Sequence, residues 1–341
     1  MLAVLTMALV ACSAGSPNSP GSSGHAVPSA KASPVKSAAA AKPVAGDREL
    51  SMAGYPGAAA LVSKAAASVP AEAILPPASD PHSDVPQYWV DHCLDAPDAA
   101  TEKVCVFGDT KNPVLTVAMV GGSTDGNWFP ALEQIALQRH WKLVTDLHGT
   151  CEWTDAMLVE AATGEKYTAC HAWGQSTLKD LETKIKPDVV VVGGYPEDGT
   201  VGDPAPGSAA SISTIAAGMA TYWTDLENHG ISVVAMRETP VPDFSLADCV
   251  VKYGRTSAKC MVPTAKAILA DSPNVLAAKD TGGKVPVIDM NQFICGPTEC
   301  APVVGNILVY FDGRHLTASY SKSMARYLEP RLLQAVPLLA K

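Results

Sequence analysis

Short apolar segments alternate with segments of helical periodicity from residue 114 to the end of the chain. The apolar segments, which we predict to be strands, are Val114–Val120, Trp141–Leu147, Val189–Val192, Ile231–Met236 and Val287–Met290. The predicted helices are Trp128–Gln138, Leu178–Ile185, Ala209–Glu227 and Thr317–Leu333. Strands with so few polar residues must be covered on both faces, which is typical of a parallel sheet between helices. We therefore predict an α/β fold, a three-layer α/β/α sandwich with a parallel sheet.

Two loops at strand–helix junctions carry residues suited to catalysis. Such folds bind ligands at the carboxyl ends of their strands. Ser123 follows the first predicted strand and Gly122, where the next helix begins and offers backbone N–H groups. Asp312 and His315 lie three residues apart before the last helix. A histidine there can accept the serine proton while the aspartate fixes the imidazole tautomer, so the order Ser, Asp, His suits acyl transfer. The alternatives are a plain turn at Ser123 and a histidine that only caps a loop.

The nine cysteines indicate an oxidising compartment. Without Cys12, eight cysteines fall into four pairs of sequence neighbours. About a hundred connectivities are possible for eight cysteines, and we favour nearest neighbours because each pair brackets a predicted loop. The favoured pairs are Cys93–Cys105, Cys151–Cys170, Cys249–Cys260 and Cys295–Cys300. No cysteine or histidine cluster has the spacing of a zinc site, so no metal is predicted.

The N-terminal segment predicts a membrane anchor. Residues 1–12 are apolar and end in Leu-Val-Ala-Cys, which resembles a bacterial lipobox with Cys12 as the lipidated residue. Signal peptides usually begin with basic residues, and this segment has none. Two alternatives therefore stay open: the true start of the protein lies upstream, or residues 1–11 are the end of a transmembrane helix that belongs to a longer protein. Residues 13–57 form a Ser/Pro/Ala-rich segment, predicted to be a disordered linker, and residues 58–341 form the folded domain, beginning with a helix over 58–67.

The net charge and the lengths of the apolar runs argue against a nucleic-acid-binding protein and against a membrane-spanning helix. The net charge of −9 argues against a nucleic-acid partner, which needs a basic face. No apolar run reaches the about 20 residues of a membrane-spanning helix, so we expect membrane contact through the lipid anchor only.

From about residue 58 to its end, the chain resembles the SGNH-type domain found at the C-terminus of bacterial cell-envelope O-acyltransferases of the acyltransferase 3 family. The segments that carry the resemblance are CVFGD (105–109), VAMVGGSTDGNWFPALEQIA (117–136), WKLV (141–144), GTC (149–151), YTACHAW (167–173), KPDVVVVGG (186–194), RETPVPDF (237–244) and CAPVVGNILVYFDGRHLTASY (300–320). The last is the most specific, because the family's Asp-x-x-His-Leu-Thr is intact. The resemblance implies a flavodoxin-like SGNH hydrolase fold and local disulfides.

The resemblance also implies roles for individual residues. Ser123 would be the nucleophile, His315 the base and Asp312 its partner. The backbone N–H of Ser123 and that of Gly149 are the candidate donors to an oxyanion. Where the family usually reads Gly-Asp-Ser-His, this chain has Gly122 and Thr124 beside the serine. These departures predict fewer polar groups around the nucleophile and a low rate.

Together these observations predict an extracytoplasmic O-acyl esterase or O-acyltransferase that acts on cell-envelope glycans and needs no cofactor. Its partners would be the acylated or acceptor glycan and a membrane acyl-donor protein. The rival hypothesis is a catalytically degenerate glycan-binding or accessory envelope lipoprotein, which the two departures favour. Trp128 and Trp173 are expected in the core, and Arg237 with Glu238 is expected to form an ion pair that braces a loop.

Overall fold

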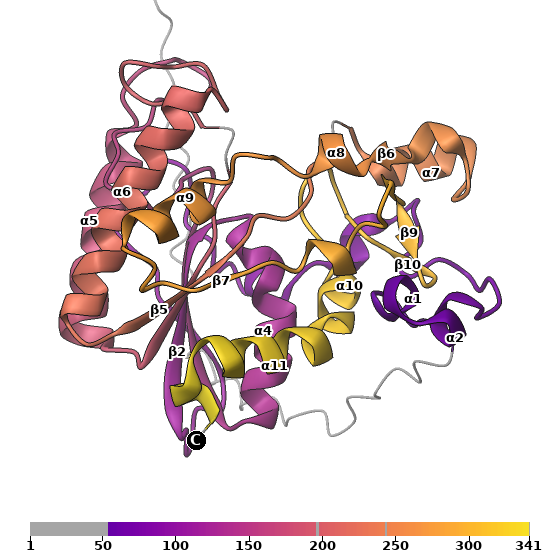
Figure 1. Cartoon of the computed structure of the whole chain (residues 1–341), viewed down its shortest axis with the longest axis horizontal. Helices are drawn as coiled ribbons and strands as arrows, with labels where there is room; N and C mark the ends of the chain where they lie inside the picture. The colour runs from indigo at the N-terminus through magenta and orange to yellow at the C-terminus, as the bar shows by residue number, and fades with distance from the viewer. Residues whose placement is uncertain (1–53, 196–197, 243, 341) are drawn as a thin grey trace, which may run out of the picture. The chain divides into compact units, whose positions relative to one another are not determined.

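The computed structural model describes residues 54–195, 198–242 and 244–340, which belong to one compact unit, Arg48–Lys341 (Figure 1). The predicted signal segment, Cys12 and residues 13–53 of the predicted linker lie outside the described residues. Residues 54–57 contact the domain: Gly57 donates its N–H to the Gly305 carbonyl at 3.2 Å, and the Gly54 carbonyl accepts from the Asn306 side chain at 2.7 Å.

A six-stranded sheet forms the centre of the unit, with the order β1-β3-β2-β4-β5-β7. Its strands are β1 Cys105–Gly108, β2 Leu115–Gly122, β3 Trp141–His148, β4 Val189–Val192, β5 Ser232–Met236 and β7 Val287–Ile288. All neighbours are parallel except β1, which runs antiparallel to β3 at one edge. The parallel strands therefore have the 2-1-3-4-5 order of flavodoxin-like folds, and the predicted fold class is confirmed. The antiparallel edge strand was not predicted.

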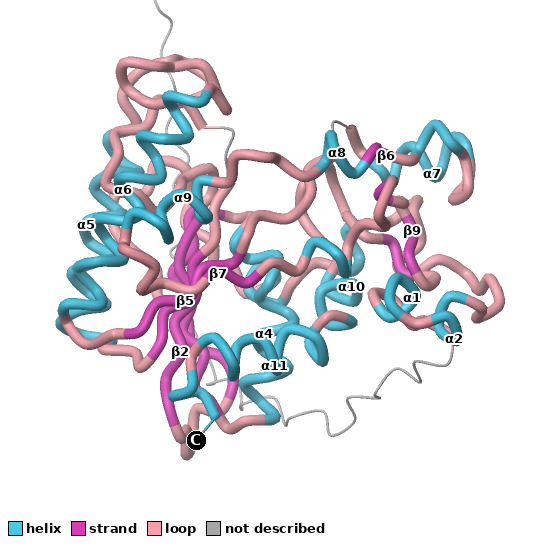
Figure 2. The backbone as a smooth tube through the Cα atoms, viewed as in Figure 1, coloured by secondary structure: helices cyan, strands magenta, loops and turns pink. Residues whose placement is uncertain are grey.

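Helices cover both faces of this sheet (Figures 1 and 2). The α-helices of the described residues are α1 Ala59–Val62, α2 Lys64–Ala67, α3 Gln87–Val90, α4 Phe129–Gln138, α5 Thr168–Asp180, α6 Ala209–Asn228, α7 Leu246–Tyr253, α8 Thr264–Ala267, α9 Pro273–Asp280, α10 Ala318–Ser323 and α11 Ala325–Ala335, and only some of them cover the sheet. In Figure 1, α5, α6 and α9 lie on one side of the sheet, and α4, α10 and α11 on the other. Two small antiparallel pairs lie outside the sheet: β6 Val262–Pro263 with β8 Glu299–Cys300, and β9 Val303–Val304 with β10 Ile307–Leu308.

Alternate residues of the central strands supply two separate cores. Met119 of β2 packs in one core with Phe129 of α4, whereas Val120 packs in the other with Trp173 of α5 and Trp223 of α6. Successive strand side chains point to opposite faces, so an apolar strand can fill both cores at once. Trp128 is also buried, as expected.

Several predicted helices have different bounds. The helix predicted over 58–67 is broken at Ser63, whose extended backbone and side chain cap α2. The last helix is divided at Met324 into α10 and α11. The helix predicted from Leu178 begins ten residues earlier, at Thr168. The sequence does not predict this first part because it has little apolar periodicity. The buried Trp173 holds it against the core.

Four disulfide bonds stabilise the loops around the sheet. They join the nearest-neighbour pairs Cys93–Cys105, Cys151–Cys170, Cys249–Cys260 and Cys295–Cys300. Each closes a short loop and so limits the freedom of the unfolded chain. In the part of the chain that the structure describes, no helix has both the length and the apolar character to cross a membrane.

Candidate active site

Ser123 lies at the carboxyl end of β2, the central strand whose neighbours are β3 and β4. The chain runs from β2 through α4 to β3, and from β3 through α5 on the opposite face to β4. A ligand crevice forms where the connections leave in opposite directions. Gly121 has φ +145°, and a Cβ there would lie 2.3 Å from Cγ of Asp125. The turn that presents Ser123 therefore requires glycine at this position.

The structure brings the three predicted catalytic side chains into one chain of contacts. Ser123 Oγ lies 2.9 Å from Nε2 of His315, and Nδ1 of the same ring lies 2.7 Å from Oδ2 of Asp312. The second Asp312 oxygen, Oδ1, accepts the backbone N–H groups of Arg314 at 2.8 Å and His315 at 2.7 Å. One carboxylate thus holds both the loop and the imidazole, which leaves Nε2 facing the hydroxyl.

Asp312 is held in its ionised form. Burial alone would raise the pKa of this carboxyl. The hydrogen bond and charge of His315, with the two backbone N–H groups, outweigh burial and lower the pKa of Asp312 below its ordinary value. An ionised carboxylate at this place can stabilise an imidazolium at His315.

Two aromatic rings fix the orientation of the histidine. The Phe311 ring stacks on His315 with centroids 5.5 Å apart at 14°, and Trp89 meets it edge-on at 5.3 Å. The neighbouring Tyr88 is buried and donates its hydroxyl to the Ser123 carbonyl at 3.2 Å. The segment just before Cys93 is therefore part of this site, which the sequence did not indicate.

Asn127 connects the serine turn to the histidine loop. Its side-chain Nδ2 donates to the Arg314 carbonyl at 3.2 Å and to Thr239 Oγ1 at 3.1 Å, and its Oδ1 accepts the N–H of Leu316 at 2.8 Å. These bonds lie on both sides of His315, so Asn127 fixes the position of His315 relative to the turn that carries Ser123. Its only sequence signal was its place four residues after the serine.

Residues 92–330 match the model of a protein family described as "SGNH domain (fused to AT3 domains)". The chain belongs to this SGNH family. Family membership indicates an acyl-transfer or acyl-hydrolase kind of activity. A search of the curated proteins finds no match.

One solved structure supports the fold of this SGNH domain, and a second is reported beside it. The periplasmic domain of a lipopolysaccharide acetyltransferase from Salmonella ser. Paratyphi A is similar, with a TM-score of 0.50 and 10% identity over 66% of this chain and 86% of that one. A putative acylhydrolase from Bacteroides fragilis NCTC 9343 matches with a TM-score of 0.32 and 12% identity over 67% of this chain and 90% of that chain.

The predicted oxyanion donor Gly149 is already bonded in the SGNH domain. Its N–H donates to the Asp95 carbonyl at 2.9 Å, and the Asp95 N–H donates to the Leu147 carbonyl at 2.8 Å. These bonds extend the end of β3 and direct the Gly149 N–H away from the nucleophile. The assignment of Gly149 as a donor is therefore wrong for this structure, whereas the N–H of Ser123 stays a prediction.

Two buried carboxyl groups surround the end of β2, where fewer polar groups were expected. Asp125 Oδ2 accepts the Gly122 N–H at 2.7 Å, and Glu152 Oε1 accepts the Tyr195 N–H at 2.5 Å. The two acids are 2% and 3% exposed. A Cβ at Gly122 would lie within 3.7 Å of both carboxyls. Glycine at 122 thus makes room for polar groups supplied by other positions, so the expected loss of polar surroundings is wrong.

Burial changes the ionisation of both acids. It raises the pKa of Asp125 to about 7, against bonds from the Gly122 and Gly193 N–H groups that lower it. Burial, together with the nearby charges of Asp125 and Asp198, raises the pKa of Glu152 well above its ordinary value. The pair therefore retains a proton at pH values where exposed carboxyls are ionised.

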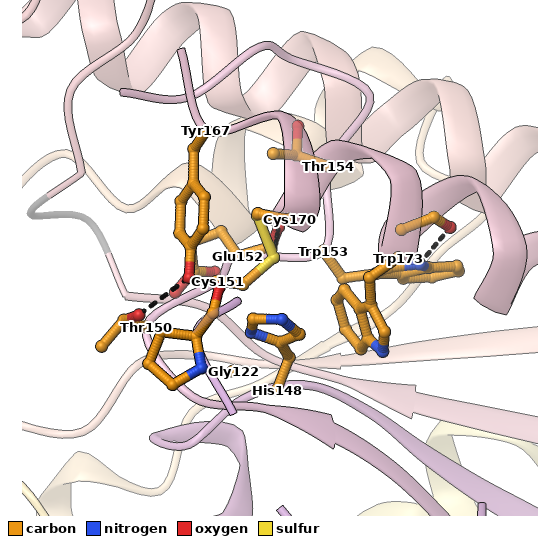
Figure 3. The surroundings of a disulfide bond; sticks show 12 residues. Gly122, His148, Thr150, Cys151, Glu152, Trp153, Thr154, Tyr167, Cys170 and Trp173 are labelled. Carbon is orange, nitrogen blue, oxygen red and sulfur yellow. Dashed lines mark hydrogen bonds between the residues drawn. A yellow bond between two sulfur atoms is a disulfide. The ribbon is translucent and has the colours of Figure 1, made fainter. Parts of the chain in front are cut away.

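The Cys151–Cys170 disulfide holds Glu152 in place (Figure 3). It ties the loop after β3 to the first turn of α5, beside Tyr167, whose hydroxyl contacts Thr150 Oγ1 at 3.1 Å. The Cys151 carbonyl would lie 3.0 Å from a Cβ at Gly122, so the loop closes directly against the end of β2.

Arg237 and Glu238 have separate partners instead of forming the expected pair. Arg237 bonds Asp289 at 3.0 Å and the Leu269 carbonyl at 2.8 Å, while the buried Glu238 accepts from Ser272 at 2.6 Å. Among the described residues, no group of three or more His, Cys, Asp or Glu side chains is arranged to hold a metal ion.

The buried acids predict an unusual dependence of stability on pH. Burial raises the pKa of Asp146, which accepts from Trp173 Nε1 at 3.1 Å, to about 7. The unfolded chain therefore loses its proton first, and the free energy of unfolding should fall as pH rises from about 4 to about 7. A shift of this size corresponds to roughly 4 kcal/mol. Urea unfolding at successive pH values, with disulfides intact, should show a smaller fall for Asp146→Asn.

Asp91→Asn, at an exposed side chain, is the control for that experiment and should follow the wild type. Equal pH dependence in the wild type and Asp146→Asn would contradict the prediction.

Proposed function

We propose that this SGNH domain is an extracytoplasmic O-acyl esterase or O-acyltransferase that acts on glycans of the cell envelope through Ser123, His315 and Asp312. The observation that carries the proposal is the continuous contact from Ser123 Oγ to His315 Nε2 at 2.9 Å and from Nδ1 to Asp312 at 2.7 Å. A hydroxyl becomes a nucleophile only when a base is within hydrogen-bond reach and is itself oriented.

The proposed reaction has two half-steps. Ser123 Oγ attacks the acyl carbonyl while His315 Nε2 takes its proton, and the Ser123 N–H donates to the oxyanion. The imidazolium then protonates the leaving group of the acyl donor, which is the sugar oxygen in the esterase case, and the acyl group stays on Ser123. In the second half-step His315 takes a proton from water or a sugar hydroxyl, whose oxygen attacks the acyl-serine. The imidazolium returns that proton to Ser123 Oγ as the acyl–serine bond breaks, and the acyl group leaves as the free acid or as the sugar ester.

The compartment and anchoring complete the proposal. Four disulfides are stable only under oxidising conditions, which supports an extracytoplasmic place. We further propose that Cys12 carries the lipid anchor and that a membrane protein supplies the acyl donor. The family description, with its AT3 partner domains, supports such a donor.

A covalent probe tests whether the serine is reactive. A fluorophosphonate should label the wild-type protein at the peptide that contains Ser123, because the oriented imidazole raises the nucleophilicity of that hydroxyl. Mass spectrometry of the labelled peptides gives the site. Ser123→Ala should remain unlabelled, and Ser319→Ala, on the first turn of α10, should label as the wild type does.

The same experiment distinguishes the enzyme from the rival hypothesis, a catalytically degenerate glycan-binding lipoprotein. That hypothesis expects no label on the wild type, or label that persists in Ser123→Ala. Either result would favour the binding protein over the enzyme.

A further inference from the structure

A groove of about 330 Å³ opens beside the loop that carries Asp312 and His315, and none of its lining residues takes part in the proposed acyl transfer. Its walls come from Tyr195 after β4, from residues that follow β5, and from Gly313 and Arg314 next to His315. The residues after β5 are Val241, Pro242, Phe244 and Ser245. The groove therefore lies at the same edge of the sheet as Ser123, where a substrate would extend beyond the reacting ester.

Arg314 is fixed relative to the catalytic side chains. Its backbone N–H donates to Asp312 Oδ1 at 2.8 Å, and its carbonyl accepts from Asn127 Nδ2 at 3.2 Å. The guanidinium lies over the Tyr195 ring, 4.8 Å from its centroid. Stacking on an aromatic face orders the side chain and leaves the N–H edge of the guanidinium for a ligand.

The Arg314 guanidinium has no ion-pair partner in the described part of the chain. None of the ion pairs among the described residues involves this exposed arginine. The protein as a whole carries a net charge of −9, which repels anions at a distance. A cation held in the groove is therefore a local attraction for a negative group, and its planar donors match a carboxylate or a phosphate.

We propose that the groove of Tyr195, Phe244 and Arg314 binds an anionic substituent, a carboxylate or a phosphate, on the glycan whose acyl ester is placed at Ser123. This inference rests on the proposed function and names the substrate class of the same site. The substituent would pair with the Arg314 guanidinium while the sugar lies between it and the catalytic serine. The site would thus select acidic glycans over neutral ones.

Matched esters test the proposal. The substrates are the acetyl esters of methyl glucoside, methyl glucuronate and methyl glucoside phosphate, and the measured quantity is the ratio of kcat/KM for each charged ester to the neutral one. The wild type should prefer a charged ester, mainly through a lower KM, and less so at high salt. In Arg314→Gln the ratio should fall by about 10–100-fold, the range of a hydrogen bond to a charged group. The glucuronate and phosphate arms show which anion is bound.

Arg326→Gln is the matched control, because this exposed arginine of α11 also stacks on a tyrosine, Tyr327, at 4.8 Å. Its ratio should equal that of the wild type. Equal ratios in the wild type and Arg314→Gln, with the esters turned over, would overturn the inference and leave the proposed function standing.

A binding measurement keeps the inference testable if no ester is turned over, a result that counts against the proposed function alone. Ser123→Ala protein is titrated with methyl glucuronate and with inorganic phosphate and followed by NMR. Binding to Ser123→Ala that is lost in the Ser123→Ala/Arg314→Gln double variant supports the groove as an anion site. No binding of either anion, or binding unchanged by Arg314→Gln, contradicts it.

Discussion

Replacing Ser123 or His315 by alanine is expected to lower kcat/KM for a small acetyl ester by about 10⁴–10⁶-fold. The two side chains share one hydrogen bond of 2.9 Å, through which the proton leaves as the new bond forms. Loss of the hydroxyl removes the attacking atom, and loss of the imidazole removes the base that contacts it. Because both act in one step, the Ser123→Ala/His315→Ala double variant should be no slower than either single variant.

The measurement is kcat/KM for the wild type, both single variants and the double variant, with and without an added glycan acceptor. Ser68→Ala and His140→Ala, at exposed positions, are the controls and should retain the wild-type rate. Acyl groups recovered on the acceptor would identify a transferase, and release to water an esterase. Wild-type turnover equal to that of Ser123→Ala in both conditions would refute the enzyme and favour the binding lipoprotein.

The sheet could be predicted because its strands carry an unusually clear signal. Val189–Val192 is apolar at every position, and only a strand between two helix layers can bury all four side chains. The edge strand β1 carries no such signal, since Val106 is exposed and Cys105 is fixed by its disulfide. Its pairing with β3 depends on tertiary contacts that no local pattern records.

That Ser123, His315 and Asp312 contact one another could be predicted for a different reason. Asp312 and His315 form a contiguous loop motif, and Ser123 follows an apolar strand and two glycines, so all three have local signatures. Asp125 and Glu152 have none, because their positions depend on the close approach of strand ends far apart in sequence. Gly149 was misassigned because the direction of an N–H is decided by its partner, here Asp95, some fifty residues earlier.

Replacing Asp312 by asparagine is expected to lower kcat by about 10⁴-fold while the loop keeps its shape. In the wild type, Oδ1 accepts two backbone N–H groups and Oδ2 accepts the proton on His315 Nδ1. An asparagine that keeps its oxygen toward the backbone turns its NH₂ group toward Nδ1. Two donors then face each other unless the ring moves its proton to Nε2. A protonated Nε2 cannot accept the proton of Ser123, so the base is lost although every heavy atom stays in place.

The chain contains a matched control for this change. Asp109 also accepts two backbone N–H groups through Oδ1, from Lys111 at 2.9 Å and Asn112 at 3.1 Å, and its Oδ2 contacts Nδ1 of His140 at 2.9 Å. Asp109→Asn therefore perturbs the same arrangement away from the serine and should leave kcat unchanged. NMR of the imidazole nitrogens should show the proton of His315 on Nδ1 in the wild type and on Nε2 in Asp312→Asn. A slow Asp312→Asn variant whose proton stays on Nδ1 would mean that the carboxylate acts through its charge instead of through the tautomer. A variant as fast as the wild type would remove Asp312 from the catalytic site.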